Sequence, residues 1–278
     1  MFKVEQWIMA AVVVVAMGGG AVAQEPAPQE PYTPTIGQAG KDVIWVPTPP
    51  DLVELMLDLA KVGPQDFVMD LGSGDGRNII AAAKRGARGV GVEYNDDMVA
   101  LSARTAAAEG VGALAQFVKG DMYEADISKA TVMALFLLPS NMEKLAPKFL
   151  ALAPGSRIVS NTFGIPGWDP DQVAEINDGE CESWCNALLW IVPAPVDGRW
   201  TVEGGGVLAL NQEYQKVLGT LSTSGDPAPA SVAGTLNGAQ ITFTAGNARY
   251  TAQVTGDRMQ GTVTRGDQEL VFVATRDR

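Results

Sequence analysis

Hydrophobic and polar residues follow two different patterns along the chain, and the change falls near Asp197. In residues 42–196, short apolar runs such as Phe67–Leu71 alternate with segments whose apolar residues recur at helical spacing. From Asp197 onwards only short strands remain, separated by turn signals such as Asn237-Gly238. The pattern predicts an α/β domain at 42–196, followed at 197–278 by an all-β meander that forms a small barrel or sandwich.

A glycine-rich turn joins the strand Phe67–Leu71 to the helix that follows it. The turn begins after the acidic residue Asp70 and places Gly72, Gly74 and Gly76 two residues apart, with Ser73 between the first two. Glycine allows a sharp turn and a close approach of the backbone to a ligand. The free N–H groups at a helix start favour a polar or anionic ligand. The turn therefore predicts a nucleotide-like cofactor.

Two further acidic residues follow later strands in the same way. Glu93 ends the short strand that begins at Gly89, where folds of this kind present a carboxylate to the two ribose hydroxyls. Gly120-Asp121-Met122 follows a third strand at 116–119. A single acid after a strand is more often a solvated or turn residue. The order and spacing of all three features favour the binding interpretation, and the glycine spacing G-x-G-x-G differs from the G-x-G-x-x-G of dinucleotide sites.

Together these motifs resemble the class I S-adenosylmethionine-dependent methyltransferases. Residues 43–49, 135–139 and 154–160 are similar to the seven-strand lysine methyltransferases related to those that modify the ATP synthase c subunit. The resemblance covers residues 43–168 and implies a Rossmann-like seven-stranded sheet with S-adenosylmethionine as cofactor. The cofactor-binding residues that it implies are Thr48, Asp70, Gly72, Ser73, Gly74, Gly76, Glu93, Asp121 and Met122.

The substrate side of the predicted site rests on three weaker candidates. Trp45 precedes the first helix, where the resembled family forms its substrate entrance, although simple packing would explain it equally well. Pro139 and Asn141 follow a fourth strand predicted at 131–138, whose carboxyl end is the expected reaction mouth. Ser140 with Glu143 fits a helix cap better than a catalyst. The sequence Leu-Leu-Pro-Ser-Asn here differs from the Asn/Asp-Pro-Pro-aromatic pattern of DNA-amino and glutamine methyltransferases.

The amino-acid composition argues against several classes of catalytic and binding site. The 278 residues include no histidine and carry a formal net charge of -12. The charge argues against a nucleic-acid partner, which needs clustered Lys and Arg. Without histidine there is no Ser-His-Asp triad and no imidazole metal site, so we expect no metal and name no catalytic base. The acceptor is expected to be a protein or a small molecule, and the oligomeric state is left open.

The first residues predict export. A short apolar run at 8–17 precedes Ala21-Val-Ala23, a small-x-small cleavage site, so residues 1–23 are interpreted as a signal peptide and 24–41 as a spacer. The expected location is the periplasm or envelope. The alternative is a protein tethered to the inner membrane, with membrane contact only if the leader stays uncleaved. Cys181 and Cys185 would then form a disulfide, or remain a buried thiol pair.

Two functions follow from these observations. The first is a methyltransferase that N-methylates a protein lysine or another amine. The second is an exported, non-enzymatic envelope protein that binds a nucleoside ligand or a partner protein, which would avoid separating an enzyme from a donor made in the cytoplasm. The complete set of cofactor residues favours the enzyme, because a decayed site should have lost some of them.

Overall fold

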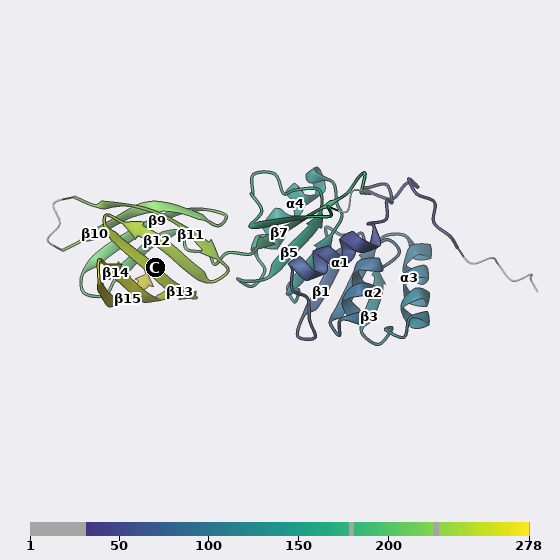
Figure 1. Cartoon of the computed structure of the whole chain (residues 1–278), viewed down its shortest axis with the longest axis horizontal. Coiled ribbons are helices and arrows are strands. Elements are labelled where there is room, and N and C mark those ends of the chain that lie inside the picture. The colour runs from purple at the N-terminus through teal and green to yellow at the C-terminus, as the bar shows by residue number, and fades with distance from the viewer. Residues whose placement is uncertain (1–31, 178–180, 225–227, 278) are drawn as a thin grey trace, which may run out of the picture. The chain divides into compact units, whose positions relative to one another are not determined.

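The computed structural model describes residues 32–177, 181–224 and 228–277 (Figure 1). The expected signal peptide at 1–23 and the first part of the spacer, residues 24–31, lie outside these residues. The first part of the chain forms four helices and a mixed sheet. The elements are α1 (Pro50–Leu59), β1 (Phe67–Leu71), α2 (Arg77–Lys84), β2 (Arg88–Glu93), α3 (Asp96–Ala108), β3 (Ala115–Lys119), β4 (Val132–Leu135), α4 (Pro139–Leu150), β5 (Arg157–Asn161), β6 (Gln172–Glu175) and β7 (Asn186–Ile191).

The sheet has seven strands in the order β3-β2-β1-β4-β5-β7-β6, as expected for the Rossmann-like fold. Strands β1 to β5 are parallel, whereas β7 pairs antiparallel with both β5 and β6. Chain order reverses between β1 and β4. In open α/β sheets, ligands bind beside such a reversal at the carboxyl ends of the strands.

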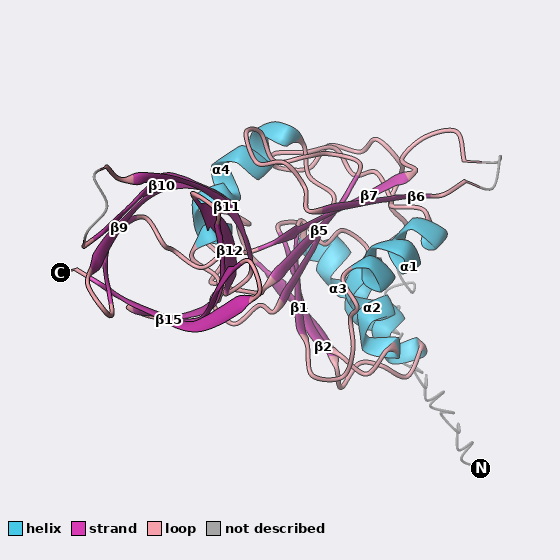
Figure 2. Ribbon diagram, turned by 60° about the vertical axis from the view of Figure 1, so that its left-hand side comes forward, coloured by secondary structure: helices cyan, strands magenta, loops and turns pink. Residues whose placement is uncertain are grey.

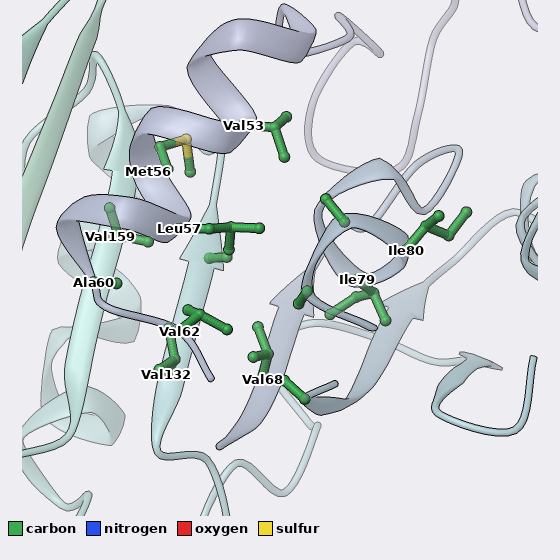
Figure 3. Packing of buried hydrophobic residues seen from close by; sticks show 14 of the residues in the cluster. Val53, Met56, Leu57, Ala60, Val62, Val68, Ile79, Ile80, Val132 and Val159 are labelled. Atoms are coloured by element: carbon green, nitrogen blue, oxygen red, sulfur yellow. The ribbon is translucent and has the colours of Figure 1, made fainter. Parts of the chain in front are cut away.

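The central strands β1, β4 and β5 are buried on both faces. Successive residues of a strand point to opposite sides of the sheet. Val68 of β1 packs with helices α1 and α2, whereas its neighbour Met69 belongs to a second apolar cluster that contains residues of α4. Figure 2 shows α1, α2 and α3 on one side of the sheet and α4 on the other. In the first cluster, Met56 and Leu57 of α1 lie over the strands (Figure 3). Uninterrupted apolar strands such as β4, which is buried throughout, follow from this arrangement.

The start of the described chain differs from the predicted spacer. Backbone hydrogen bonds join Gly37 to Trp45 and Trp45 to Gln38, each at 2.9 Å, and Ala39 pairs with Ile44. A hairpin therefore begins within the range 24–41, ahead of the predicted boundary at 42. The range 24–41 is rich in Pro, Gln and Gly, which predicted a flexible spacer. The same residue types also form tight turns, so composition alone does not separate a spacer from a hairpin.

The cap predicted at Ser140 is wrong, and neither helix that begins with proline has a side-chain cap. Helix α1 starts at Pro50 with Pro49 as its N-cap, and α4 starts at Pro139 with Leu138 as its N-cap; neither cap residue makes a side-chain hydrogen bond. Thr48 and Ser140 therefore do not cap. Proline fits the first helical turn without a side-chain cap, since it has no N–H to satisfy. By contrast, Asn95 caps α3, and its side chain accepts from the N–H groups of Asp97 and Met98.

The segment between β5 and β7 contains β6, a short edge strand whose residues are mostly exposed. It lacks the apolar alternation that would have revealed it. The same segment carries a disulfide between Cys181 and Cys185, whose Cα atoms are 6.0 Å apart. Of the two states left open by the sequence, the structure shows the bonded one.

The second part of the chain is a closed antiparallel barrel of eight strands. Because the sheet closes on itself, the domain is a barrel, which was one of the two predicted forms, and not a sandwich. Two-residue turns at Gly238-Ala239 and at Gly256-Asp257 connect strands, the first of them one residue later than the predicted Asn237-Gly238, with positive φ at both glycines (57° and 55°). The strands are β8 (Gly198–Val202), β9 (Gly206–Glu213), β10 (Lys216–Thr223), β11 (Ala230–Asn237), β12 (Gln240–Ala245), β13 (Ala248–Thr255), β14 (Arg258–Arg265) and β15 (Gln268–Arg276).

Side chains fill the interior of the barrel. Phe243 and Tyr250 stack with their ring centroids 4.6 Å apart, and Phe272 meets both rings edge-on. An eight-stranded barrel is just wide enough for such a core. The barrel interior is therefore a packed core, and the chemistry must be sought in the α/β part of the chain.

Candidate functional site

A pocket lies at the carboxyl ends of β1, β2 and β4, beside the reversal in strand order. Its wall combines the glycine turn after β1, the residues after β2 and β3, and the hairpin that precedes α1. Eight of the nine predicted cofactor residues line it; Gly76, the ninth, starts helix α2 directly behind the turn. The lining includes Lys41, Trp45, Thr48, Asp70, Gly72, Ser73, Gly74, Asn78, Glu93, Tyr94, Asp121, Met122 and Phe136.

The glycine turn needs its glycines for two reasons. Gly72, Gly74 and Gly76 have φ values of 74°, 56° and 81°, a region that L-residues with a Cβ rarely adopt. At Gly76 a Cβ would also lie 2.6 Å from the ring of Phe117. The turn can therefore pass close to β3 and start α2 only with glycine at this position.

The N–H groups of this turn are used within the protein. Gly72 and Ser73 both donate to the carbonyl oxygen of Val92, at 2.8 and 3.1 Å, and Gly74 donates to Glu93. These three N–H groups are therefore not available to a ligand, and they are distinct from the N–H groups of the helix start at Arg77. The hydrogen bonds instead fix the turn against the end of β2.

Glu93 is held by the same contacts. Its Oε2 accepts from the N–H of Gly74 and its Oε1 from the N–H of Asn95, both at 2.9 Å. A carboxylate has about four acceptor positions, so each oxygen keeps further capacity. The backbone thus orients the carboxylate while leaving it able to accept hydrogen bonds from a ligand with two neighbouring hydroxyls.

Asp70 is almost fully buried, with 3% of its surface exposed. Burial raises the pKa of its carboxyl group well above the usual value; the hydrogen bond from Asn78 opposes this, and the negative charges of Glu93 and Asp75 add to it. Asn78 Nδ2 donates to Asp70 Oδ2 at 3.0 Å, while the buried Oδ1 of Asn78 has no partner. Among the described residues no cation pairs with Asp70, so the pocket presents an acid suited to a cationic ligand group.

Asp121 faces the pocket with a partner that the sequence did not reveal. Lys41 of the hairpin donates to its carboxylate, and the N–H of Tyr123 donates to it at 2.9 Å. The hydrogen bond from Lys41 holds the pKa of Asp121 below its usual value. Lys41 also lies 5.3 Å from the ring centre of Tyr94. No local pattern linked Lys41 to a residue eighty positions later.

The segment before α1 crosses the glycine turn. The indole of Trp45 lies so close to Gly74 that a Cβ there would be 2.6 Å from the indole nitrogen. Thr48 is 3% exposed and its Oγ1 accepts from Asn161 Nδ2 at 3.2 Å, while its carbonyl accepts from Arg77 at 2.5 Å. Thr48 thus connects the pocket wall to the end of β5.

The predicted substrate residues separate in the structure. Trp45 lines the pocket, whereas Pro139 and Asn141 do not: Pro139 begins α4, and Asn141 is 4% exposed with a buried, unpartnered Nδ2. Phe136, the residue directly after β4, lines the pocket instead. An aromatic residue at the carboxyl end of a core strand was the signal that could have identified it.

The arrangement fits one ligand class well. It offers a buried acid that no cation of the described chain pairs with, a second acid with free acceptor positions, a third acid bonded to Lys41, the ring of Tyr94 and the apolar side chain of Met122. A nucleoside joined to an amino acid has the matching groups, namely an ammonium, a ribose diol, a purine ring and an amino group on that ring.

Comparison with known proteins gives a consistent result. Residues 70–172 match the family model described as the ANTKMT methyltransferase domain. A protein-lysine N-methyltransferase of Saccharolobus islandicus (strain REY15A) is 46% identical over 140 residues, which cover 49% of this chain and 87% of the relative. A lysine N-methyltransferase of Rattus norvegicus that is named for the ATP synthase c subunit is 37% identical over 105 residues, or 37% of this chain; the match spans 49% of that relative's length.

A solved structure extends the match to three dimensions. The RNA methyltransferase from Salinibacter ruber, in complex with S-adenosyl-L-homocysteine, has a TM-score of 0.51 and 42% identity, and the match covers 54% of this chain and 96% of that one. These similarities confirm the resemblance inferred from the motifs and identify S-adenosylmethionine as the cofactor. The chain belongs to the class I S-adenosylmethionine-dependent methyltransferases, within the family of protein-lysine N-methyltransferases.

Proposed function

We propose that the pocket binds S-adenosylmethionine through Asp70, Glu93 and Asp121, and that the enzyme methylates the side-chain amine of a protein lysine. Asp70 would pair with the ammonium of the methionyl part, Glu93 would accept from the ribose hydroxyls, and Asp121 would face the adenine together with Met122. The observation that carries the cofactor assignment is the buried carboxylate of Asp70, which lacks a cationic partner among the described residues.

The cofactor supplies an electrophilic methyl group when bound, and the protein must position and deprotonate the amine. Loss of a proton from an amine of pKa near 10.4 costs roughly 4–5 kcal/mol at neutral pH. Apolar surroundings lower that cost because they disfavour the charged form. Positioning of amine and methyl group supplies much of the remaining rate enhancement.

Two acceptor classes have support. The two lysine methyltransferases compared above are named for protein lysine, whereas the relative from Salinibacter ruber is described as an RNA methyltransferase. The net charge of -12 favours the protein, since an RNA site needs positive charge along the phosphate backbone. We therefore propose a protein acceptor and treat RNA as the second candidate. The family relationship supports the enzyme over the non-enzymatic envelope protein.

We also propose that the protein is exported, with residues 1–23 removed. The bonded state of Cys181 and Cys185 supports this, because disulfides persist in oxidising compartments. In the described parts of the chain, no helix is long and apolar enough to cross a membrane. The proposed location is the periplasm or envelope, and the tethered form remains the alternative.

Replacement of Glu93 tests the cofactor site. We expect Glu93→Ala to weaken S-adenosylhomocysteine binding about 10- to 100-fold, because hydrogen bonds to a charged group contribute about 1.5–3 kcal/mol. Calorimetric titration measures the affinity. The matched control is Glu109→Ala, which removes a surface acid paired with Lys84, and it should bind like the wild type. Equal affinity of Glu93→Ala and wild type would contradict the assignment.

The substitution Asp70→Asn should raise the stability of the folded protein and weaken its binding of the cofactor product. The folded state raises the pKa of Asp70, so between the unfolded and folded pKa values it holds a proton that the unfolded state has released, and stability falls as pH rises through this window. The variant should therefore unfold at a higher temperature than the wild type at neutral pH without ligand.

The same substitution should weaken S-adenosylhomocysteine binding about tenfold or more, since a charge-assisted hydrogen bond is lost. In the wild type the affinity should increase with pH as Asp70 ionises, whereas in the variant this dependence should disappear. Thermal unfolding and titration at pH 5 and pH 8 measure both effects. A variant that is less stable and binds normally would refute the role of Asp70.

The acceptor class can be tested with labelled S-adenosylmethionine. The purified enzyme is incubated with protein and RNA fractions from the source cells, and we expect label in protein that is sensitive to protease and resistant to ribonuclease. Acid hydrolysis should then yield methyl-lysine. Label that ribonuclease removes would instead support the RNA acceptor.

The export proposal predicts a mature protein that begins at Gln24. Mass spectrometry of protein isolated from fractionated source cells measures the terminus and the compartment. Ala23→Glu should block processing because the cleavage site requires small residues. An intact Met1 terminus in the cytoplasmic fraction would contradict export.

A further inference from the structure

Three aromatic side chains gather beside the pocket, on segments that are far apart in the sequence. Phe136 follows β4, Phe163 follows β5, and Trp184 lies just before β7. The ring centroids of Phe136 and Phe163 are 5.9 Å apart, and Trp184 meets both edge-on, at 5.2 and 5.4 Å. We call these three residues the aromatic cluster. Because Phe136 also lines the cofactor pocket, the cluster is continuous with its wall.

A disulfide encloses Trp184 in a short covalent ring. Cys181 and Cys185 are bonded around it, and the carbonyl of Cys185 accepts from the N–H of Ile176 at 2.9 Å. Trp184 has a φ of 61°, which is unfavourable for a bulky residue. Such a conformation persists only where the surrounding structure fixes it, and it often marks a functional position. Here the short covalent ring fixes it.

Unsatisfied polar groups lie directly before Phe163 in the chain. Asn161 is fully buried and its Oδ1 has no hydrogen-bond partner, and the Oγ1 of Thr162 is likewise buried and unpartnered. Thr162 also has a positive φ of 56°, which is rare for a β-branched residue. The other amide atom of Asn161 donates to Thr48, which lines the pocket. Both unpartnered oxygens can accept a hydrogen bond from a ligand.

Aromatic faces and hydrogen-bond acceptors together suit an alkylammonium group. A cation is attracted to the negative face of an aromatic ring, most strongly to tryptophan. A buried polar atom without a partner costs stability, and a ligand that satisfies it recovers that cost. A neutral alkyl group would gain binding free energy only from apolar contact with the rings. The combination therefore discriminates in favour of a cationic, hydrogen-bond-donating chain end.

We propose that the aromatic cluster and Asn161 form the site that receives the acceptor amine, and that the Cys181–Cys185 disulfide is required to hold its Trp184 wall. The proposal deepens the proposed function and rests on it. Trp184 is assigned as a specificity-determining residue on the acceptor side. Neither cysteine lines the cofactor pocket, so the disulfide is expected to act on acceptor binding.

The test measures binding of butylammonium chloride, with 1-butanol as its neutral counterpart, to the purified protein with and without saturating S-adenosylhomocysteine. Binding is followed by ligand-observed NMR titration. The variants are Trp184→Ala, Trp184→Phe and the double variant Cys181→Ser/Cys185→Ser. Thermal unfolding and S-adenosylhomocysteine affinity are measured for each, so that general misfolding is detected separately.

We expect Trp184→Ala and the double variant to bind butylammonium about threefold to thirtyfold more weakly, the range that cation–π contacts contribute. Trp184→Phe should keep most of the affinity because it keeps a ring. S-adenosylhomocysteine affinity should be unchanged in all three. Asn161→Ala should weaken butylammonium more than 1-butanol.

Two results would overturn the proposal. One is that the wild type binds butylammonium no better than 1-butanol. The other is that Trp184→Ala and the double variant bind butylammonium as the wild type does, which would leave the aromatic cluster as packing. If the wild type fails to bind S-adenosylhomocysteine, that result contradicts the proposed function and not the amine site. The titration of butylammonium without S-adenosylhomocysteine then still shows whether the aromatic cluster binds the amine.

Discussion

The site depends on the hydrogen bonds between the glycine turn and the end of β2. Gly72 and Ser73 bind the carbonyl of Val92, and Gly74 binds the carboxylate of Glu93. These contacts place two acids from different strands, Asp70 and Glu93, at fixed positions around one pocket. The backbone can make them because positive φ angles turn the chain back towards β2. Helix α2 and the wall formed by Trp45 follow from that turn.

The carboxyl edge of the sheet carries polar groups that the fold alone does not satisfy. Asp70 is buried without a cation among the described residues, and Asn78, Asn141 and Asn161 each have an unpartnered buried atom. In a protein interior such groups are usually paired, since each one left unpaired costs about 1–3 kcal/mol. Strand ends elsewhere in the sheet are tied by internal bonds, as between Asp66 and Thr131 at 2.8 Å. The concentration of exceptions at one edge is a physical signature of a binding site.

Local patterns predicted much of the fold and the pocket. Apolar runs and glycine signals located nearly every strand, because strand burial and turn geometry act on residues close in sequence. The edge strand β6 was missed because exposure removes that pattern. The contacts of Lys41 with Asp121 and of Trp184 with Phe136 could not be predicted, since each joins segments that only the tertiary structure brings together. Thr48 lines the pocket where the resemblance implied a cofactor residue, and its side chain bonds Asn161.

The closed barrel has a consequence for synthesis of the chain. Seven of its eight strand pairs join neighbours in sequence, whereas Ala274, Thr275 and Arg276 of β15 pair with Val202, Thr201 and Trp200 of β8. Contacts of such long separation form late, because the loop-closure entropy must be overcome first. On the ribosome, the sheet has all its strands available before β15 emerges. The barrel alone must wait, with β8 and β14 exposing unpaired edges until that last strand arrives.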